Sequence, residues 1–169
     1  ARFNKGDMTT AAYKKELSFY ASLVKQNKVQ ILAVSEIENA LVAQHLAKQI
    51  GGDWKSFFMQ GRDTATGQDV ALLSNLPLVA GTLTDFGFPS GQLPGSSGKK
   101  KRLSKVVGAQ FWINSNHSKQ KIGVITAHFL SKRKDTIKKS QNRQRQAHAL
   151  VKAMDAFLED VTKLVVLGD

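Results

Sequence analysis

The chain has 169 residues, of which 41% are hydrophobic, and this length and apolar content suit one domain with a substantial core. Cysteine is absent, which excludes disulfides, thiolate zinc sites and cysteine nucleophiles, so any metal must be bound by oxygen or imidazole ligands, which favours Mg²⁺, Ca²⁺ or Mn²⁺. The formal net charge of +12 is concentrated between residues 99 and 145, where fourteen Lys and Arg side chains accompany one acid, Asp135, and this excess indicates either polyanion binding or a solvated basic loop.

The first third of the chain predicts a helix, a strand and a second helix. Thr9 or Thr10 can cap a helix that ends near residue 26, because apolar residues recur there at helical spacing. The short apolar run Ile31–Val34 fits a strand buried on both faces. Asn39 then precedes a second helical pattern, and Gly51 is placed to end it.

The middle of the chain predicts consecutive strands, which favours antiparallel pairing. The stretch Phe88–Lys101 is rich in Gly, Ser, Pro and Lys and indicates a loop within the domain, since strand patterns flank it closely. The predicted strands are Trp54–Met59, Val70–Leu73, Leu78–Thr84, Val106–Ile113 and Ile122–Ala127.

The last third predicts a long helix and a final strand. Ser140 can cap a helix that continues through Leu158, and the apolar strand Leu164–Leu167 then leads to Gly168 and Asp169. Such a mixture of elements favours sheets with helices packed outside them. Because a buried strand ends at the last residue given, we expect the natural protein to continue beyond it.

Three ionisable residues share one setting, because Glu36, His128 and Asp169 each lie at the end of an apolar strand run or just after it. Ligands usually bind at such strand ends in layered α/β folds. Two carboxylates and an imidazole would suit a divalent cation with a phosphate diester. The alternative for each is structural, as a helix cap, a turn residue or a satisfied donor. Asp69 is interpreted as a turn residue rather than a further ligand.

Four segments resemble motifs of one known family, in the same order. The segments are Ile31–Asn39, Gly67–Ser74, Thr126–Phe129 and Val165–Asp169. The first resembles a strand followed by Gln-Glu, with Ser35 in place of the Gln, and the second resembles a segment common in the family's secreted bacterial nucleases. The third resembles a strand-ending histidine segment, and the fourth resembles the start of a Gly-Asp-Phe-Asn motif. The family is that of the endonuclease/exonuclease/phosphatase (DNase I-like) proteins, and the chain looks closest to its secreted bacterial nucleases.

The resemblance implies an α+β (α/β) fold, a four-layer αββα sandwich of mixed sheets. Residues 1–169 would form a single domain of this kind, incomplete at the C-terminus and missing the first strand. The metal-binding Asn of that strand is then lost, or is Asn4, and the later His-Asp pair is absent. The resemblance therefore implies an incomplete catalytic set in this chain.

The resemblance also implies roles for five residues. Glu36 would bind the metal, with Mg²⁺ expected and Ca²⁺ or Mn²⁺ as alternatives. His128 and Asp169 would be catalytic. Arg102, shortly before a strand, and Arg143, in a segment similar to the basic start of the family's next helix, would bind the substrate phosphate.

The function expected from these residues is metal-dependent phosphodiester hydrolysis, with a nuclease acting on DNA or RNA as the leading hypothesis. A phosphatase or a phospholipid phosphodiesterase of the same fold is the second, and the basic region would then face an anionic membrane surface. The third is a non-catalytic polyanion-binding module. No protein partner is expected. The family resemblance suggests a secreted or periplasmic location, although the chain shows no signal peptide and no apolar run near the roughly 18 residues of a membrane span.

Overall fold

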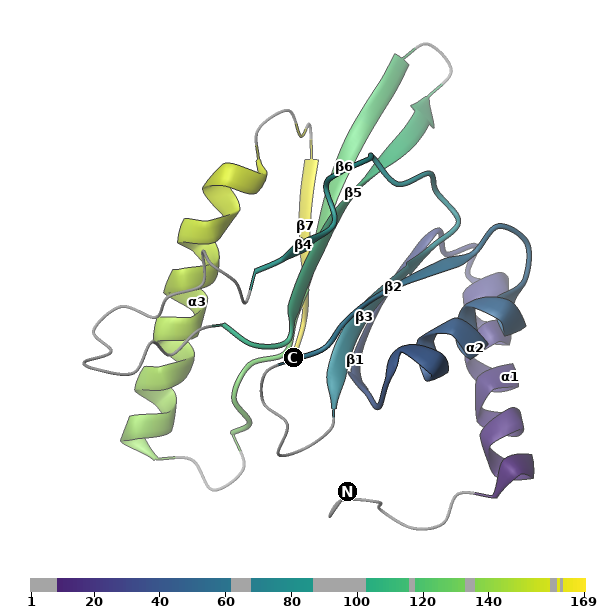
Figure 1. Cartoon of the computed structure of the whole chain (residues 1–169), viewed down its shortest axis with the longest axis horizontal. Coiled ribbons are helices and arrows are strands. Elements are labelled where there is room, and N and C mark those ends of the chain that lie inside the picture. The colour runs from purple at the N-terminus through teal and green to yellow at the C-terminus, as the bar shows by residue number, and fades with distance from the viewer. Residues whose placement is uncertain are drawn as a thin grey trace.

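A computed structural model describes residues 9–61, 68–86, 103–115, 118–132, 136–158, 161 and 163–169. Helices and strands alternate along the chain much as the sequence predicts (Figure 1). The elements in chain order are α1 (Thr10–Gln26), β1 (Ile31–Ile37), α2 (Ala40–Ile50), β2 (Lys55–Met59), β3 (Asp69–Ser74), β4 (Thr84–Asp85), β5 (Val106–Ser115), β6 (Ser118–Ala127), α3 (Ile137–Phe157) and β7 (Lys163–Gly168).

The strands form two sheets that face each other. The first sheet has the order β1-β3-β2 and is antiparallel, and the second has the order β4-β5-β6-β7, in which only β6 and β7 are parallel. Helices α1 and α2 cover the outer face of the first sheet, and α3 covers the outer face of the second (Figure 1). The expected four-layer αββα sandwich is confirmed.

The two N-terminal helices begin and end where local chemistry predicts. The Thr9 hydroxyl accepts a hydrogen bond from the Ala12 N–H at 3.2 Å, and the Asn39 carboxamide accepts one from the Val42 N–H at 3.1 Å. Gly51 ends α2 with φ 85°, a left-handed conformation that a residue without Cβ adopts freely. These caps position β1 between two helices.

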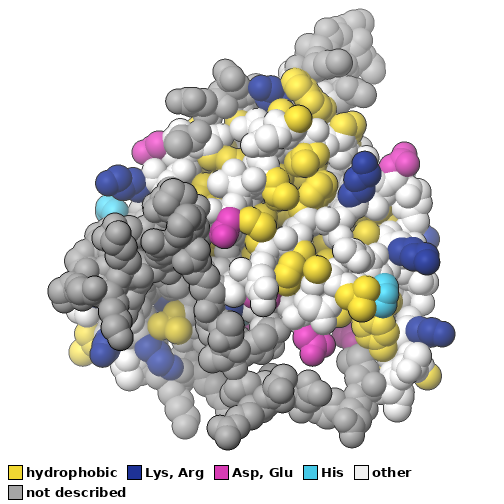
Figure 2. Space-filling view, in the orientation of Figure 1, with side chains coloured by type: hydrophobic (Ala, Val, Ile, Leu, Met, Phe, Trp, Pro, Cys, Tyr) yellow, Lys and Arg dark blue, Asp and Glu magenta, His cyan; other side chains and the backbone are white. Residues whose placement is uncertain are grey.

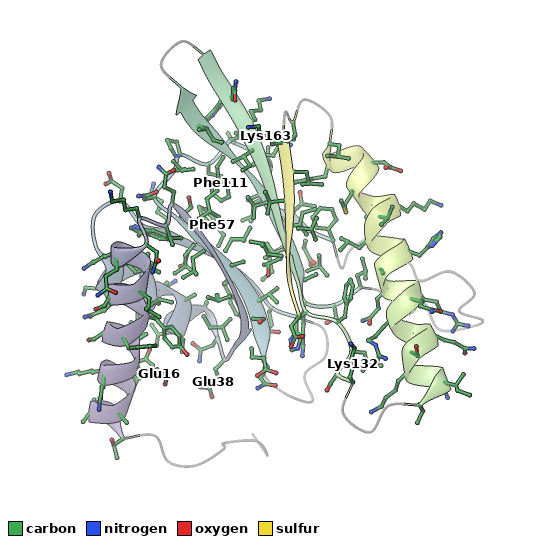
Figure 3. All side chains as sticks on the ribbon, turned by 180° about the vertical axis from the view of Figure 1, so that it is seen from behind. Glu16, Glu38, Phe57, Phe111, Lys132 and Lys163 are labelled. Carbon is green, nitrogen blue, oxygen red and sulfur yellow. The ribbon has the colours of Figure 1, made fainter. Side chains whose placement is uncertain are left out.

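Strand β3 is buried on both faces and connects two parts of the core. Val70 and Leu72 pack toward the second sheet, whereas Ala71 and Leu73 pack under α1 and α2. Between the sheets, the rings of Phe57 and Phe111 meet edge to face at 5.7 Å (Figure 3). The continuous apolar run of β3 in the sequence follows from this double burial.

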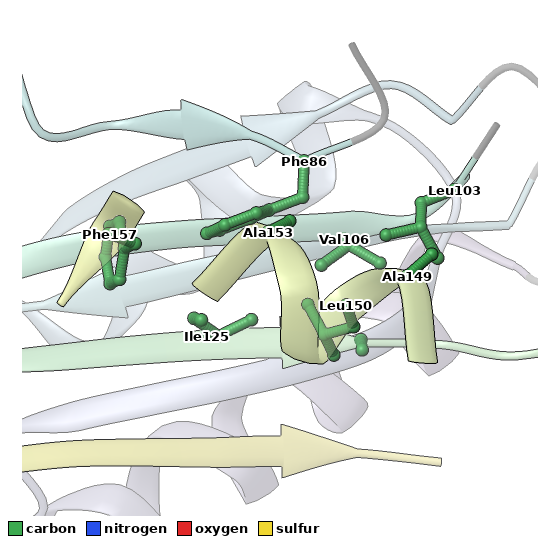
Figure 4. Packing of buried hydrophobic residues seen from close by; sticks show 9 residues of the cluster. Phe86, Leu103, Val106, Ile125, Ala149, Leu150, Ala153 and Phe157 are labelled. Atoms are coloured by element: carbon green, nitrogen blue, oxygen red, sulfur yellow. The ribbon is translucent and has the colours of Figure 1, made fainter. Parts of the chain in front are cut away.

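A second part of the core lies under α3 (Figure 4). The rings of Phe86 and Phe157 pack edge to face at 5.3 Å over the second sheet. Gly108 lies beneath them, and a Cβ there would come within 2.5 Å of the Phe86 ring. The absence of a side chain at this strand position therefore lets both rings lie against the sheet.

The surface of the described residues combines charged and apolar areas. On the face in Figure 2, hydrophobic side chains lie exposed across the middle, while Lys and Arg side chains lie toward the margins. Apolar atoms are common on the surfaces of folded proteins, so this area alone needs no explanation. Within the ranges that the structure describes, none of the helices combines the length and the apolar character that crossing a bilayer demands.

The prediction of a strand at Leu78–Thr84 is wrong. Only Thr84–Asp85 pairs with β5, as the short strand β4, and Leu78 makes an isolated bridge to Phe111. The intervening chain turns at Gly81, which has φ 76°, and the Thr82 hydroxyl donates to the Val79 carbonyl at 2.7 Å. Local turn chemistry thus interrupts the apolar run.

The prediction that Ser140 caps the long helix is also wrong. Thr136 is the cap, and its hydroxyl accepts from the Lys139 N–H at 3.2 Å. The Ser140 N–H donates to the Thr136 carbonyl, which places Ser140 inside the first turn of α3. The loop predicted at Phe88–Lys101 lies outside the described residues.

The expectation of buried strands at Ile31–Val34 and Leu164–Leu167 needs correction. Strand β1 lies at one edge of the first sheet and is half-buried, and β7 lies at one edge of the second. Val165, Val166 and Leu167 are accordingly exposed. An apolar run of this length does not distinguish a central strand from an edge strand.

Candidate active site

Five strands, β1, β3, β5, β6 and β7, each begin or finish at the same end of the sandwich. In the first sheet, Ile37 at the end of β1 pairs with Asp69 at the start of β3. In the second, Ala127 at the end of β6 pairs with Val106 on one side and Gly168 on the other. Because β1 contacts both β6 and β7, the two sets of ends lie close together, near the C-terminus in Figure 1.

Glu36 and His128 meet across the two sheets at this end. The His128 Nε2 lies 3.9 Å from the Glu36 Oε1. The His128 side chain is 11% exposed and the Glu36 side chain 54% exposed, so the pair borders on solvent from the carboxylate side. The Gln68 Nε2 donates to the other carboxylate oxygen of Glu36 at 3.4 Å. Two of the three residues singled out in the sequence thus lie side by side.

The backbone of Glu36 adopts an uncommon conformation that aims its side chain. Glu36 has φ 59°, and the pairing of β1 with β3 shifts between Ser35 and Ile37, which marks a β-bulge. A non-glycine residue in the left-handed region costs about 1 kcal/mol or more, and such residues gather at functional sites. Bulges also re-aim side chains beside active sites. The strain is therefore a reason to regard Glu36 as functional.

His128 is held by backbone hydrogen bonds to two different strand ends. Its N–H donates to the Lys105 carbonyl at 2.9 Å, and the next residue, Phe129, donates to the Asp169 carbonyl at 2.9 Å. The imidazole Nδ1 is buried and has no hydrogen-bond partner among the described residues. The backbone at His128 is therefore fixed in place, and the ring lies with its Nε2 toward Glu36.

Asp169 lies beside His128 through its backbone. Its N–H donates to the Ala127 carbonyl at 3.1 Å, and its carbonyl accepts from Phe129. The Asp169 side chain is exposed. The structure thus brings the third predicted residue to the same strand ends, with its backbone paired to the segment that carries His128.

Asp69 is a buried strand residue, so its interpretation as a turn residue is wrong. It begins β3, is 5% exposed, and its Oδ1 accepts from the Gly61 N–H at 2.7 Å. A Cβ at Gly61 would lie 2.7 Å from that oxygen and 2.8 Å from the Lys105 Cγ. The ends of the two sheets therefore approach so closely at Gly61 that no side chain fits there.

Replacing Asp69 with alanine is expected to lower the free energy of unfolding by about 1–3 kcal/mol, because the partly buried Gly61 N–H would lose its acceptor. Urea unfolding followed by circular dichroism measures this change. Asp53→Ala, at an exposed turn position, is the matched control and should change stability by about 0.5 kcal/mol or less. Equal effects of the two substitutions would contradict a structural role for Asp69.

Sequence reasoning missed Gly61, Gln68 and Lys105, which all lie at this end of the sandwich. Lys105 is 8% exposed and has φ 59°, directly before β5. In the sequence it is one of many lysines in a basic region, and nothing there distinguishes it. Only the pairing of the strands reveals its place.

The donor set suits a hard cation with few protein ligands. Among the described residues, no three His, Asp or Glu side chains come together closely enough to form a complete metal-binding cluster. Mg²⁺ usually keeps several waters and needs only one or two carboxylates together with substrate phosphates. The exposed Glu36 carboxylate, with an oxygen facing His128, fits that requirement.

The two arginines predicted to bind phosphate are placed differently. Arg102 lies outside the described residues, as does Asn4. Arg143 lies on α3, half-buried, one layer outside the sheet that carries His128. Its proposed contact with substrate remains a prediction.

Comparison with known proteins gave matches among solved structures alone. No protein-family model matches the chain. No curated protein matches it either. The fold therefore rests on structural similarity.

Three of the similar structures show what that fold is. The human Nocturnin catalytic domain with bound sulfate has a TM-score of 0.63 at 13% identity, over 91% of this chain and 56% of that one. An endonuclease/exonuclease/phosphatase family protein from Bacteroides thetaiotaomicron has a TM-score of 0.63 at 14% identity, over 93% and 54%. This chain has the DNase I-like fold of that family. ANGEL2, a 2′,3′-cyclic phosphatase in complex with adenosine-2′,3′-vanadate, has a TM-score of 0.59 at 14% identity, over 89% and 42%.

The similarity confirms the resemblance seen in the sequence at the level of the fold. The chain spans about half the length of these solved structures, with 56%, 54% and 42% of them covered. The similarity therefore establishes the fold, and the activity and substrate of the whole protein are proposals.

Proposed function

We propose that the protein is a metal-dependent phosphodiesterase, and that it is a nuclease acting on DNA or RNA. The observation that carries the proposal is the pair of Glu36 and His128, 3.9 Å apart at the common end of two sheets, with Glu36 on a strained bulge. The DNase I-like fold supports it, because solved structures of that fold include a phosphatase.

Glu36 is the residue that would hold the cation, for which we propose Mg²⁺, with Ca²⁺ and Mn²⁺ as alternatives. Such a cation, when bound, supplies charge that polarises a phosphoryl oxygen and favours ionisation of water. Gln68 keeps the carboxylate in place by donating to its second oxygen. Glu36 therefore already has a side-chain hydrogen bond before any ligand arrives.

His128 would act on the phosphate through its Nε2, which faces Glu36 at the solvent border. An N–H at this atom can donate to a phosphoryl oxygen or protonate the leaving oxygen. The exposed Asp169 side chain, on the strand beside it, would orient the attacking water. The rigid backbone pairing of both segments favours precise positioning.

Basic residues next to this end of the sandwich support a polyanionic substrate. Lys132 follows β6 (Figure 3), Lys138 lies in the first turn of α3, and Arg145 follows two turns later; all three are exposed. The first turn of α3 carries no acid, although helix N-termini favour acids. Positive charge at a positive helix end is stabilised by an external anion, such as a nucleic-acid backbone.

Replacing Lys132 and Lys138 with glutamine should weaken nucleic-acid binding and leave hydrolysis of a small phosphodiester unchanged. The slope of log Kd against log salt should fall by about 1–2, since each lost phosphate contact removes about 0.9. Fluorescence anisotropy at several salt concentrations measures it. Lys14→Gln with Lys15→Gln, on exposed positions of α1, is the matched control. If the control variant showed the same decrease in the slope of log Kd against log salt, net charge alone would explain the binding.

A small phosphate ester or a phospholipid head group is the second candidate substrate. ANGEL2 is a 2′,3′-cyclic phosphatase with the same fold, and the basic residues would also suit an anionic membrane surface. A substrate panel separates the candidates. The full-length protein would be incubated with Mg²⁺, Mn²⁺ or Ca²⁺ and with plasmid DNA, single-stranded RNA, a cyclic nucleotide or anionic liposomes. Hydrolysis of none of them would end the phosphodiesterase proposal.

A further inference from the structure

Two buried polar atoms on β6 and its extension have no hydrogen-bond partner among the described residues. They are the Thr126 Oγ1 and the His128 Nδ1. Thr126 is only 1% exposed. Buried hydroxyl and imidazole groups nearly always have a partner, and an exception calls for a water, an ion or a functional reason.

The two side chains lie on the same face of the sheet. Thr126 pairs with Val107, which belongs to the core between the sheets, and the His128 ring reaches Glu36 on the opposite sheet. Residues two apart along a strand share a face, and their Cα atoms are about 6.5 Å apart. One water molecule with two hydrogen bonds of about 2.8 Å connects polar atoms up to about 5.6 Å apart, a separation that side chains on neighbouring positions of one face can reach.

We propose that Thr126 is a positioning residue for His128, acting through a buried water that bridges the Thr126 hydroxyl and the His128 Nδ1. The inference rests on the proposed function, in the form in which the His128 Nε2–H donates a hydrogen bond to a phosphoryl oxygen of the substrate. The hydroxyl donates to the water, and the water donates to Nδ1. The result is the imidazole tautomer with its proton on Nε2, directed toward Glu36 and the substrate.

The direction of the hydrogen bonds follows from Glu36. An ionised carboxylate only accepts hydrogen bonds, and the Glu36 Oε1 faces the His128 Nε2 at 3.9 Å. The carboxylate therefore favours the tautomer with the proton on Nε2, which leaves Nδ1 as an acceptor. A donor behind the ring then completes the arrangement, and the Thr126 hydroxyl is the buried group two residues away that can supply it.

The environment of Thr126 argues against a packing role for its hydroxyl. The cross-strand residue Val107 and the strand neighbour Val124 are both buried and aliphatic. At such a position valine fills the same shape without a polar atom to desolvate. A hydroxyl retained there is explained by a hydrogen bond to water.

The test compares Thr126→Val, which keeps the shape and removes the hydroxyl, with Thr126→Ser, which keeps the hydroxyl. Long-range ¹H–¹⁵N NMR of the full chain reports which imidazole nitrogen carries the proton, and the spectrum of His128→Ala identifies the His128 signals among the four histidines. We expect the Nε2–H form to dominate in the parent and in T126S. In T126V the Nδ1–H form should increase, kcat should fall about tenfold and KM should stay unchanged.

An unchanged His128 tautomer in T126V, together with a higher Tm, would overturn the proposal, because it would mean that the Thr126 hydroxyl is buried without influencing His128. A T126S variant as impaired as T126V would overturn it too. Thr126→Ala provides the same comparison if the valine variant fails to fold. The NMR comparison needs no substrate, so it tests the role of Thr126 even in a protein without hydrolytic activity. Absence of hydrolysis would contradict the proposed function only.

Discussion

His128→Ala is expected to lower metal-dependent phosphodiester hydrolysis by about 10²–10⁴-fold, the range that a general acid or base contributes. The imidazole is nearly buried and directed at the Glu36 carboxylate, and backbone hydrogen bonds hold His128 and Phe129 to the neighbouring strand ends. No other described histidine has this setting: the His45 Nδ1 pairs with the Tyr13 hydroxyl at 2.9 Å, and His148 is exposed on α3. Initial rates with the best substrate of the panel, at saturating metal, measure the change.

His148→Ala is the matched control and should retain full activity, because its side chain lies on the exposed face of α3. Circular dichroism and thermal unfolding of both variants separate a loss of chemistry from a loss of fold. If the two alanine variants kept the same rate, His128 would have no part in the reaction.

Glu36→Gln extends the same prediction to the other half of the pair. The substitution keeps the size of the side chain and removes its charge, so the loss should resemble that of His128→Ala, and a higher metal concentration should relieve part of it, because Glu36 is the proposed ligand of the cation. Residues that act as a unit are strongly non-additive. The double variant should therefore be scarcely slower than either single variant. Losses that multiply would indicate two independent roles.

The part of the fold that sequence predicts well depends on neighbouring residues. Thr9, Asn39 and Gly51 form the predicted caps because each bonds to the backbone within a few positions. Thr136 and Ser140 are both suitable caps by the same chemistry, and the sequence offers no reason to choose. The structure selects Thr136, since the Ser140 N–H is already bonded inside the helix.

The site could be predicted only in outline, because its details arise from contacts between distant segments. Strand ends identified Glu36 and His128, and the fold brings them together. The bulge at Glu36 depends on pairing with β3, and the role of Asp69 depends on its bond to Gly61. Thr126 reads in the sequence as one more β-branched strand residue. Its hydroxyl gains meaning only when the opposite sheet covers it.

Gly168→Ala is expected to disrupt the end of β7 and to destabilise the protein by about 4 kcal/mol or more. Gly168 has φ 141°, and a Cβ there would lie 1.8 Å from the Ala127 carbonyl oxygen and 2.8 Å from its carbonyl carbon. These are backbone atoms, which no rotamer change can move. The neighbouring Asp169 would lose its bonds to Ala127 and Phe129, and the segment that positions His128 would loosen.

Gly81→Ala is the control that separates the clash from the backbone conformation. Gly81 also has a positive φ, 76°, but a Cβ there would meet nothing within 4 Å. Its substitution should therefore cost only about 1–2 kcal/mol. Urea unfolding measures both values, and hydrogen exchange of the Phe129 amide reports the local opening, which should accelerate in Gly168→Ala alone. Equal costs for the two variants would mean that β7 can shift away from β6 without penalty, and that Asp169 is not held beside His128 as the strand pairing requires.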